Sequence, residues 1–377
     1  MSEIVIVGAG PAGLAVAAIL RRRGVRPTLL ERGEAVGSNW RHRYDGLRLN
    51  TVRWLSGLPG HAIPRRAGRW VSRDDYVSYL ERYADLHHLD VVPQVDVDLI
   101  VTGRGTGSTR WRLHTSKGEL TASAVVVASG PFDRPVVPAW PGLDRYGGAF
   151  AHAATYRDPT PYRGRHVLVI GGGASGLEIS LLLAEGGAAQ VDLAVRSCTN
   201  LFPRQLGPYP LTPLPATKHA PRWLLDAAGV LTHRMLGSSW PDPLPRPAAG
   251  LGTALYRDGT EPVVADGIVA AVRAGRIGLL PAVDRFMATA VHLVDGSVVR
   301  PDMVLAATGY RSRVEHLTRE LDVFERQGRL IRGDGGPCPA APGIAFIGFQ
   351  PAVTGRLPQL PSQARRAAHT VLAVAAP

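Results

Sequence analysis

Short, continuous apolar runs alternate along the chain with longer stretches that end at or near glycine. The runs lie at residues 4–7, 125–127, 167–170 and 304–307, and they are rich in valine, isoleucine and leucine. Runs of this length without polar positions are typical of parallel strands that are buried on both faces. The stretch at residues 11–23 has the composition and length of a helix. This alternation predicts an α/β fold with parallel sheets.

The first apolar run is followed by a glycine-rich turn. Gly8, Gly10 and Gly13 form the pattern G-x-G-x-x-G. In such a turn the first glycine permits a tight bend, the second lets the backbone approach a pyrophosphate, and the third lets helix and strand pack closely. The free N–H groups of the helix N-terminus then hold the phosphates. Glu31 ends the next strand, 18 residues after Gly13, where a carboxylate accepts hydrogen bonds from ribose hydroxyls.

The same pattern recurs in the middle of the chain, with Gly171, Gly173 and Gly176 in the three glycine places. The strand that follows ends in Arg196, 20 residues after Gly176. An arginine at this place is expected for a ribose 2′-phosphate, whereas the alternative is a surface arginine at a strand end. The two copies predict two Rossmann-like domains, with NADPH at the second site and FAD or NAD at the first. Two nucleotides in one chain imply hydride transfer from nicotinamide to a flavin.

Length and charge are compatible with this interpretation. A chain of 377 residues is long for a single core, so two domains are expected. The net charge is +12, but the arginines are scattered and the longest pure run is Arg21–Arg23. We therefore expect no nucleic-acid partner, and instead solvated arginines with a preference for small anionic molecules.

The two cysteines, Cys198 and Cys338, lie far apart in the sequence. They form no CxxC pair, so we expect no metal, no local disulfide and a reducing, cytoplasmic location. Flavin-disulfide reductases share the two-site layout, but they need a redox cysteine pair that this spacing excludes. The apolar run Ile4–Leu20 has 17 residues, three glycines and no basic leader, so we expect neither a signal peptide nor a membrane segment there.

The stretch YGGAFAHAATYR, residues 146–157, resembles a known family signature. Tyr146, Gly148, His152 and Tyr156 match the pattern F-x-G-x-x-x-H-x-x-x-F/W/Y of the flavin-containing monooxygenases, with tyrosine as the first aromatic. The resemblance implies that this stretch links the flavin domain to the NADPH domain, where the nicotinamide must pivot after hydride transfer. His152 is either catalytic or a residue that orders a turn, and we favour the structural role.

Further motifs resemble the same family, particularly its branch of plant YUCCA enzymes and bacterial relatives, along nearly the whole chain. Residues 37–40 resemble a G-G-x-W motif in which Ser38 replaces the second glycine. Residues 125–138 and 304–314 resemble two A-T-G elements, and the second is very YUCCA-like. Asn50 begins a segment similar to N-T-x-K/R, whose asparagine lies near the reactive face of the flavin in heteroatom-oxidising members, whereas YUCCA enzymes usually have histidine there.

The resemblance implies an NADPH- and O2-dependent monooxygenase that contains FAD. In this family, NADPH reduces FAD, and reduced FAD combines with O2 to form a C4a-(hydro)peroxyflavin that oxygenates a small organic substrate. Asn50 as a catalytic residue favours oxygenation at nitrogen or sulfur; its alternative role is an Asx turn. YUCCA-like oxidative decarboxylation of a 2-oxo acid and Baeyer–Villiger oxidation are alternatives. An NADPH-dependent flavin reductase without oxygen transfer is the rival class.

We expect an FAD-binding domain at residues 1–145 and 311–377, a linker at 146–165, and an inserted NADPH-binding domain at 166–310. The Pro-rich segment at about 198–256 either caps the site and shapes substrate access or is a surface excursion without ligand contact. The C-terminal helix is expected to begin at Ser362 as its N-cap. The expected partners are O2 and a small molecule, with no membrane, and a homodimer is a further expectation.

The candidate site residues follow from these motifs. Asn50 is the catalytic candidate, the four signature residues mark the linker, and no metal ligand is expected. The cofactor-binding candidates are Gly8, Gly10, Pro11, Ala12, Gly13, Glu31, Arg32, Trp40, Asn50, Gly130, Gly171, Gly173, Ala174, Ser175, Gly176, Arg196, Ser197, Thr308, Gly309 and Gln363.

Overall fold

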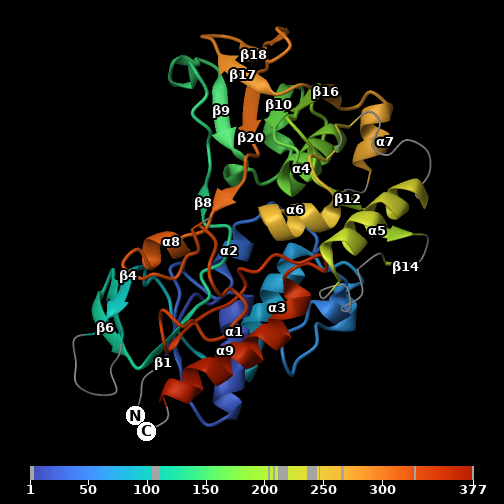
Figure 1. The fold of residues 1–377 in the computed structure, drawn as a ribbon. Coiled ribbons are helices and arrows are strands. Elements are labelled where there is room, and N and C mark those ends of the chain that lie inside the picture. Colours follow the sequence, from blue (N-terminus) through green and yellow to red (C-terminus); the bar gives the residue numbers. More distant parts are fainter. Residues whose placement is uncertain are drawn as a thin grey trace.

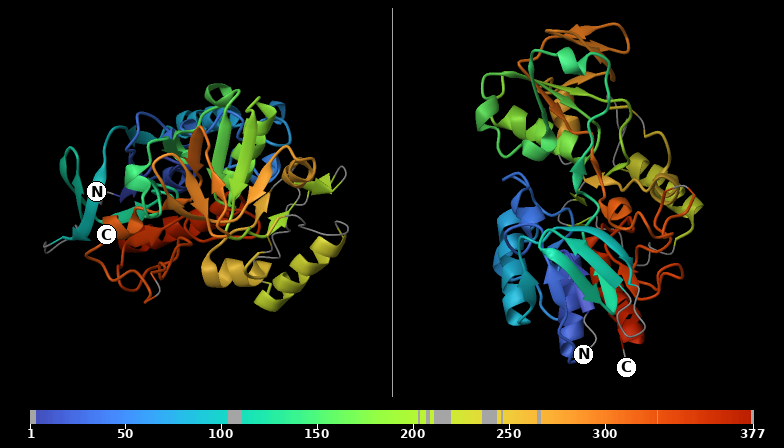
Figure 2. Two further views of the ribbon diagram at one scale, coloured as in Figure 1. Left: turned by 90° about the horizontal axis from the view of Figure 1, so that it is seen from above. Right: turned by 90° about the vertical axis from the view of Figure 1, so that its left-hand side faces the viewer.

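The computed structural model describes residues 4–103, 111–202, 204–206, 209–210, 220–235, 244–245, 247–264, 267–326 and 328–375. Two parallel β-sheets lie one above the other along the long axis of the molecule, each in its own domain (Figure 1). A narrow connection joins the two domains (Figure 2). The two Rossmann-like units expected from the glycine fingerprints are therefore both present, and the second is inserted into the first.

The first domain is built on five parallel strands in the order β22-β7-β1-β2-β3. Ile6 and Val126 face one side of this sheet, and Val5 and Val125 face the other. Both faces are buried, which explains why the sequence shows no polar alternation in these strands. The strands are β1 (Ile4–Val7), β2 (Thr28–Leu30), β3 (Asp90–Val92), β7 (Ala124–Val127) and β22 (Ile344–Phe346).

Three helices cover one face of the first sheet, and a three-stranded antiparallel meander covers the other. The central helix α1 is buried from Ala12 to Leu20, where it packs between its two neighbours. On the opposite face, Trp111 and Leu113 of the meander contact the sheet. The helices are α1 (Pro11–Arg22), α3 (Arg73–Leu86) and α9 (Leu360–Ala375); the meander strands are β4 (Val97–Thr102), β5 (Trp111–Thr115) and β6 (Gly118–Ala122).

The second domain repeats this plan. Its five parallel strands have the order β16-β11-β10-β20-β9, with helices on one face and a second antiparallel meander on the other. The strands are β9 (Ala149–His152), β10 (His166–Ile170), β11 (Gln190–Ala194), β16 (Gly278–Leu280) and β20 (Met303–Ala306). The other elements are α4 (Ala174–Glu185), α7 (Ile268–Arg273), β17 (Val283–Phe286), β18 (Val291–Leu293) and β19 (Val298–Val299).

The chain passes between the domains twice, and the two passages are paired with each other. β8 (Arg134–Pro135) leads out of the first domain, β21 (Tyr310–Arg311) leads back, and they form an antiparallel ribbon. After the first passage the chain enters β9, which pairs with β20 at the edge of the second sheet. Residues 149–152, which the sequence suggested as part of a linker, are thus a strand of the second domain.

A cap lies between the domains on one side, formed by the described residues of the second domain from Leu201 to Val264 (Figure 1). Its helices pack through Leu225, Leu251 and Leu255, and Val353 of the first domain completes this cluster. The apolar positions of the stretch WLLDAAGVLTHRML recur with helical periodicity and predict the first of these helices, whereas no sequence pattern predicts the second. Residues 211–219 and 236–243 of the Pro-rich segment lie outside the described residues. The elements are β12 (Leu201–Phe202), β13 (Gln205–Leu206), β14 (Tyr209–Pro210), α5 (Arg222–Met235), α6 (Leu251–Asp258) and β15 (Val263–Val264).

The remaining elements are short. They are α2 (Ser38–Arg41), α8 (Val314–Leu317), η1 (Arg53–Leu55), η2 (Arg65–Ala67), η3 (Leu143–Arg145), η4 (Ala153–Thr155), η5 (Thr160–Tyr162) and η7 (Leu357–Gln359). Because η7 precedes it directly, α9 begins at Leu360, two residues before the expected cap Ser362. Among the described residues, no helix is both long and apolar enough to cross a membrane.

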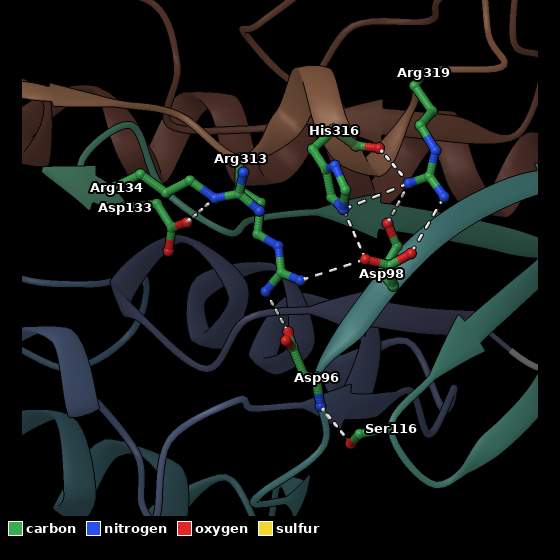
Figure 3. Close-up of polar contacts among 8 residues, drawn as sticks. All are labelled: Asp96, Asp98, Ser116, Asp133, Arg134, Arg313, His316 and Arg319. Carbon is green, nitrogen blue, oxygen red and sulfur yellow. Dashed lines mark hydrogen bonds and ion pairs between the residues drawn. The ribbon is translucent and has the colours of Figure 1, made fainter. Parts of the chain in front are cut away.

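An ion-pair network fixes the chain where it returns to the first domain (Figure 3). Arg313 pairs with Asp96 at the start of the meander, and Arg319 contacts Asp98 at 3.2 Å. His316 Nε2 lies 2.6 Å from Asp98 Oδ1, and this hydrogen bond contributes most to lowering the pKa of Asp98. The network binds α8 to β4, so the second passage enters the first domain at a fixed place.

Candidate functional site

The first glycine fingerprint forms the turn between β1 and α1. Gly8 has φ +106°. A Cβ at this position would lie 2.7 Å from the carbonyl oxygen of Ala128, which directly follows β7. A Cβ on Gly13 would overlap the Gly8 carbonyl oxygen. A Cβ on Gly10, by contrast, meets no protein atom within 4 Å. Gly8 and Gly13 are therefore required by the protein itself, while Gly10 leaves space where a ligand can approach the N-terminus of α1.

The second fingerprint has the same geometry between β10 and α4. Gly171 has φ +130°, a Cβ on Gly176 would overlap the Gly171 carbonyl oxygen, and Gly173 is open within 4 Å. Gly173 is the N-cap of α4, so Ala174 and Ser175 form its first turn. In the first domain, Gly10 is likewise the N-cap of α1, and Pro11 and Ala12 form its first turn. Each domain thus presents a helix N-terminus without a side-chain cap. Both turns fit a dinucleotide pyrophosphate.

The acid and the arginine that follow the two turns have different surroundings. Glu31 is held at the end of β2 by two backbone donors, Ala9 N–H to Oε2 and Gly33 N–H to Oε1, each at 2.8 Å. The carboxylate is therefore fixed beside the turn, in reach of a ribose. Arg196 is exposed after β11 and has no ion pair among the described residues. A free guanidinium at this place fits a ribose 2′-phosphate, with Ser197 next to it.

Two other expected cofactor contacts are partly used for internal packing. Arg32 pairs with Asp133 at 2.6 Å, which ties β2 to the start of the interdomain passage. Trp40 packs edge-on against Tyr76, with ring centroids 4.8 Å apart. Ser38, which replaces a family glycine, is buried, and its Oγ donates to the Ala35 carbonyl at 2.6 Å. A Cβ on Gly33 would overlap this hydroxyl, so Gly33 makes the space that Ser38 fills.

The ends of β7 and β20 bring two open glycines to the junction of the domains. Gly130 and Gly309 have φ +80° and +89°, and a Cβ on either meets no atom within 4 Å. Thr308 Oγ1 donates to the Val136 carbonyl, so this hydroxyl supports the ribbon rather than facing a ligand. The Ser129 hydroxyl is buried without a hydrogen-bond partner among the described residues. An unpartnered buried hydroxyl at a strand end fits a polar ligand group in the crevice.

Gln363 lies inside the first domain and supports a turn. Its side chain is 1% exposed, and its Oε1 accepts from the Gly348 N–H at 3.1 Å. Arg356 donates to the carbonyl oxygens of Gly348 and Phe349 at 3.1 and 2.9 Å. Gly348 in turn lies against Ala12 at the start of α1. Gln363 thus supports the Gly348 turn, which lies next to the start of α1.

The four signature residues have separate packing roles. The ring of Tyr146 lies over Gly148 so closely that a Cβ there would overlap it, and the same ring packs on Phe286. His152 ends β9 and stacks edge-on against Tyr310 of the ribbon, with centroids 5.2 Å apart. Tyr156 is 1% exposed. It packs against Tyr44, whose hydroxyl donates to Glu178 on α4. The signature therefore joins the second sheet to the ribbon and to the first domain.

His152 is a neutral acceptor in this arrangement. Its Nδ1 accepts from the Ala154 N–H at 3.0 Å, so the ring proton lies on Nε2. Nε2 is buried without a hydrogen-bond partner among the described residues. Burial lowers the pKa of His152, and the nearby Gly309 backbone offsets this only in part. Protonation would place a second donor against the Ala154 N–H.

We therefore expect acid to destabilise the protein through His152. Since its pKa in the folded protein lies below its ordinary value of about 6.5, the stabilising neutral form is fully present above that pH and is lost as the pH falls through the folded pKa. His152→Asn keeps an acceptor for Ala154 but does not titrate. Thermal unfolding between pH 8 and pH 5 should show a smaller acid-induced loss for the variant. Equal pH slopes would contradict this role.

Asn50 lies between the first domain and the cap. Its side chain is exposed, and its Oδ1 accepts from Arg204 Nη2 at 3.0 Å. The Arg204 guanidinium also lies over the Trp70 ring, 5.2 Å from its centroid. Sequence motifs did not indicate Arg204, Trp70 or the Tyr44–Glu178 pair, because each contact joins segments far apart in the chain. These cross-domain contacts are visible only in the folded structure.

The chain matches the family model described as "Pyridine nucleotide-disulphide oxidoreductase" over residues 5–201. It is 34% identical to a probable indole-3-pyruvate monooxygenase of Arabidopsis thaliana, YUCCA3, over 86% of this chain and 76% of that protein. It is also 34% identical to indole-3-pyruvate monooxygenase YUCCA1 of Oryza sativa subsp. japonica, over 86% and 80% of the two chains. A solved flavin-containing monooxygenase from Stenotrophomonas maltophilia shares the fold, with a TM-score of 0.73, 23% identity and 99% coverage of both chains.

Proposed function

The chain belongs to the pyridine nucleotide-disulphide oxidoreductase family, on its YUCCA-like flavin-containing monooxygenase branch; from this premise we propose that it transfers one oxygen atom from O2 to the nitrogen or sulfur of a small organic substrate. It is an FAD-containing, NADPH-dependent monooxygenase. The observation that carries the proposal is the pair of glycine turns at Gly10 and Gly173, each of which leaves space for a ligand. The two turns follow strands of the two parallel sheets and lie on either side of the junction between the domains.

We assign FAD to the first turn and NADPH to the second. Gly10 and Glu31 hold the pyrophosphate and ribose of FAD, and Gly173 and Arg196 hold the pyrophosphate and 2′-phosphate of NADPH. When bound, FAD accepts hydride from NADPH and, once reduced, activates O2; that this occurs at flavin carbon C4a stays a prediction. The overall balance is substrate, O2, NADPH and H⁺ giving oxygenated substrate, NADP⁺ and water.

The two cysteines of the chain argue against disulfide reduction through a redox-active cysteine pair. Cys198 and Cys338 are both buried free thiols, and burial raises the pKa of Cys198 to about 11. A disulfide reductase needs two neighbouring thiols, one of them a thiolate at neutral pH. The protein therefore shares the nucleotide-binding layout of disulfide oxidoreductases without their redox pair.

Asn50 supports heteroatom oxygenation. A neutral amide can donate a hydrogen bond to oxygen held at the flavin without giving up a proton. The second candidate is oxidative decarboxylation of a 2-oxo acid, which is favoured by the curated relatives named indole-3-pyruvate monooxygenases. Baeyer–Villiger oxidation ranks below both, since the signature continues from Tyr156 to Arg157 without the tryptophan common in those enzymes.

The test begins with anaerobic reduction of the holoenzyme by NADPH, followed by rapid mixing with ¹⁸O2 while the flavin spectrum is recorded. Amines, sulfides and 2-oxo acids are supplied in turn. Incorporation of one ¹⁸O atom into a product supports oxygenation, and the class of product separates the two candidates. Release of all the oxygen as hydrogen peroxide with every substrate class would replace the proposal by the flavin reductase.

Replacing Asn50 by serine is expected to raise hydrogen peroxide released per NADPH by about 10-fold, because one preorganised donor is lost. Flavin reduction by NADPH should stay within about twofold, since Asn50 is assigned to the oxygen step alone. The measurement compares anaerobic reduction rates with peroxide yields. Unchanged coupling would remove Asn50 from the mechanism.

A further inference from the structure

Arg204 of the cap is the side chain from the second domain that contacts Asn50. The two residues are 154 positions apart, and the hydrogen bond from Nη2 to Oδ1 is 3.0 Å long. Arg204 is half-buried, and its guanidinium lies over Trp70 of the first domain. A cation over an indole face is held by electrostatic attraction as well as by contact. The arginine is therefore placed by two groups of the first domain.

The chemistry of the guanidinium fixes which way the Asn50 amide points. Arginine has only donors, so the amide atom that faces it must be the carbonyl oxygen. This holds whichever way the amide oxygen and nitrogen are assigned, because an NH2 group facing Arg204 would place two donors together. With Oδ1 directed to Arg204, the NH2 group of Asn50 is directed away from the cap arginine and is free to donate elsewhere.

The contact also makes the amide depend on the position of the cap. Glu261 of the cap accepts from the Ala352 N–H at 2.9 Å and pairs with Arg356 at 3.1 Å. Val353 lies in the apolar cluster of α5 and α6. The cap is thus docked on the first domain by contacts independent of Arg204. Arg204 reaches Asn50 only while these contacts hold the cap in place.

From these contacts we infer that Arg204 is a positioning residue, which orients the Asn50 amide so that its NH2 group donates into the flavin site only when the cap is docked. The inference rests on the proposed role of Asn50 in oxygen transfer. Beyond that role, the inference states that Arg204 of the second domain orients the NH2 donor of Asn50 in the first. Docking of the cap and readiness for the oxygen step are thereby coupled through one hydrogen bond.

The first test uses Arg204→Met, which keeps an apolar stem over Trp70 but removes every donor. Peroxide released per NADPH is expected to rise about 5–10-fold, while the anaerobic rate of flavin reduction stays within about twofold of the unsubstituted enzyme. Arg204→Lys keeps one charged donor and should restore part of the coupling. Arg222→Met is the matched control, because Arg222 is an exposed cap arginine at the start of α5. It should change neither quantity.

The second test measures the contact without turnover. Asn50→Asp converts the hydrogen bond into an ion pair with Arg204, so it should unfold at a temperature about 2 °C above Asn50→Ala. In the Arg204→Met background this difference should vanish. The Asp variant has no NH2 donor, so it should nevertheless release as much peroxide as Asn50→Ser.

The outcomes separate this inference from the proposed function. If the unsubstituted enzyme oxygenates a substrate but Arg204→Met has normal coupling, or the Asp–Ala difference persists without Arg204, the inference is wrong and the function stands. If the unsubstituted enzyme transfers no oxygen to any substrate, the function fails, and the thermal cycle alone still decides whether Arg204 holds residue 50.

Discussion

Gly13→Ala is expected to prevent the first domain from folding stably. The added methyl would overlap the Gly8 carbonyl oxygen, and it would also lie 3.3 Å from Cγ2 of Ile6. Neither α1 nor β1 can shift, because α1 is buried from Ala12 to Leu20 and β1 is buried at every position. Overpacking against backbone in such a core costs about 3 kcal/mol or more. Little soluble protein, or a large drop in the midpoint of thermal unfolding, is the expected result.

Gly10→Ala is the matched control, and it should separate folding from cofactor binding. Its methyl meets no protein atom within 4 Å, so the apoprotein should keep its unfolding midpoint to within a few degrees. The methyl would occupy the space next to the pyrophosphate, so FAD affinity should fall at least about 100-fold. Retained FAD affinity in Gly10→Ala would show that the first turn does not hold the flavin phosphates. Gly173→Ala should have the same effect on NADPH while leaving FAD bound.

Arg196→Ala is expected to weaken NADPH binding much more than NADH binding. A charge-assisted contact to a phosphate contributes about 1.5–3 kcal/mol, which corresponds to about 10–150-fold in affinity. NADH lacks the 2′-phosphate, so its dissociation constant should change less than about threefold. Dissociation constants for both cofactors with the anaerobic, FAD-loaded protein give the answer directly.

The control for this prediction is Arg276→Ala, an exposed arginine of the same domain that precedes β16, at the opposite end of the sheet. It changes the net charge equally but should not discriminate between the cofactors. Equal loss of both nucleotides in Arg196→Ala would mean that the arginine contacts a part they share, and the 2′-phosphate assignment would be wrong.

Local sequence patterns predicted the parallel sheets and both phosphate turns, because each depends on neighbouring residues. Gly8 and Gly13 are both required within one strand–turn–helix unit, so their spacing in the sequence is sufficient to predict the turn between β1 and α1. The pattern of residues 268–273 likewise predicts a short helix that is stopped by Gly275, and α7 occupies these residues, with Gly275 at φ +69° just after its end. The start of α9 was misplaced because the preceding turn η7 continues directly into it.

Contacts across the junction could not be predicted in this way. The requirement for glycine at 148 follows from the Tyr146 ring, and the requirement at 33 follows from Ser38, so neither is a backbone rule. Helix α6 is short, and its buried side is defined by α5 and by Val353 of another domain. Arg204 stands in a Pro-rich segment without periodicity, and its partner lies 154 residues earlier. The roles of such residues can be recognised only from the folded structure, in which the distant segments are in contact.

The ribbon of β8 and β21 has a consequence for how this architecture can be recombined. The Val136 N–H donates to the Gly309 carbonyl at 3.0 Å, so the segment between them leaves and re-enters the first domain at one point. A segment with adjacent ends can be removed and its place closed by a short turn, or exchanged for another nucleotide-binding unit, without rerouting the first domain. The second domain is thus an exchangeable insertion in the first. On the assignment proposed above, exchanging this insertion would change the nicotinamide cofactor that is used and leave the flavin site in place.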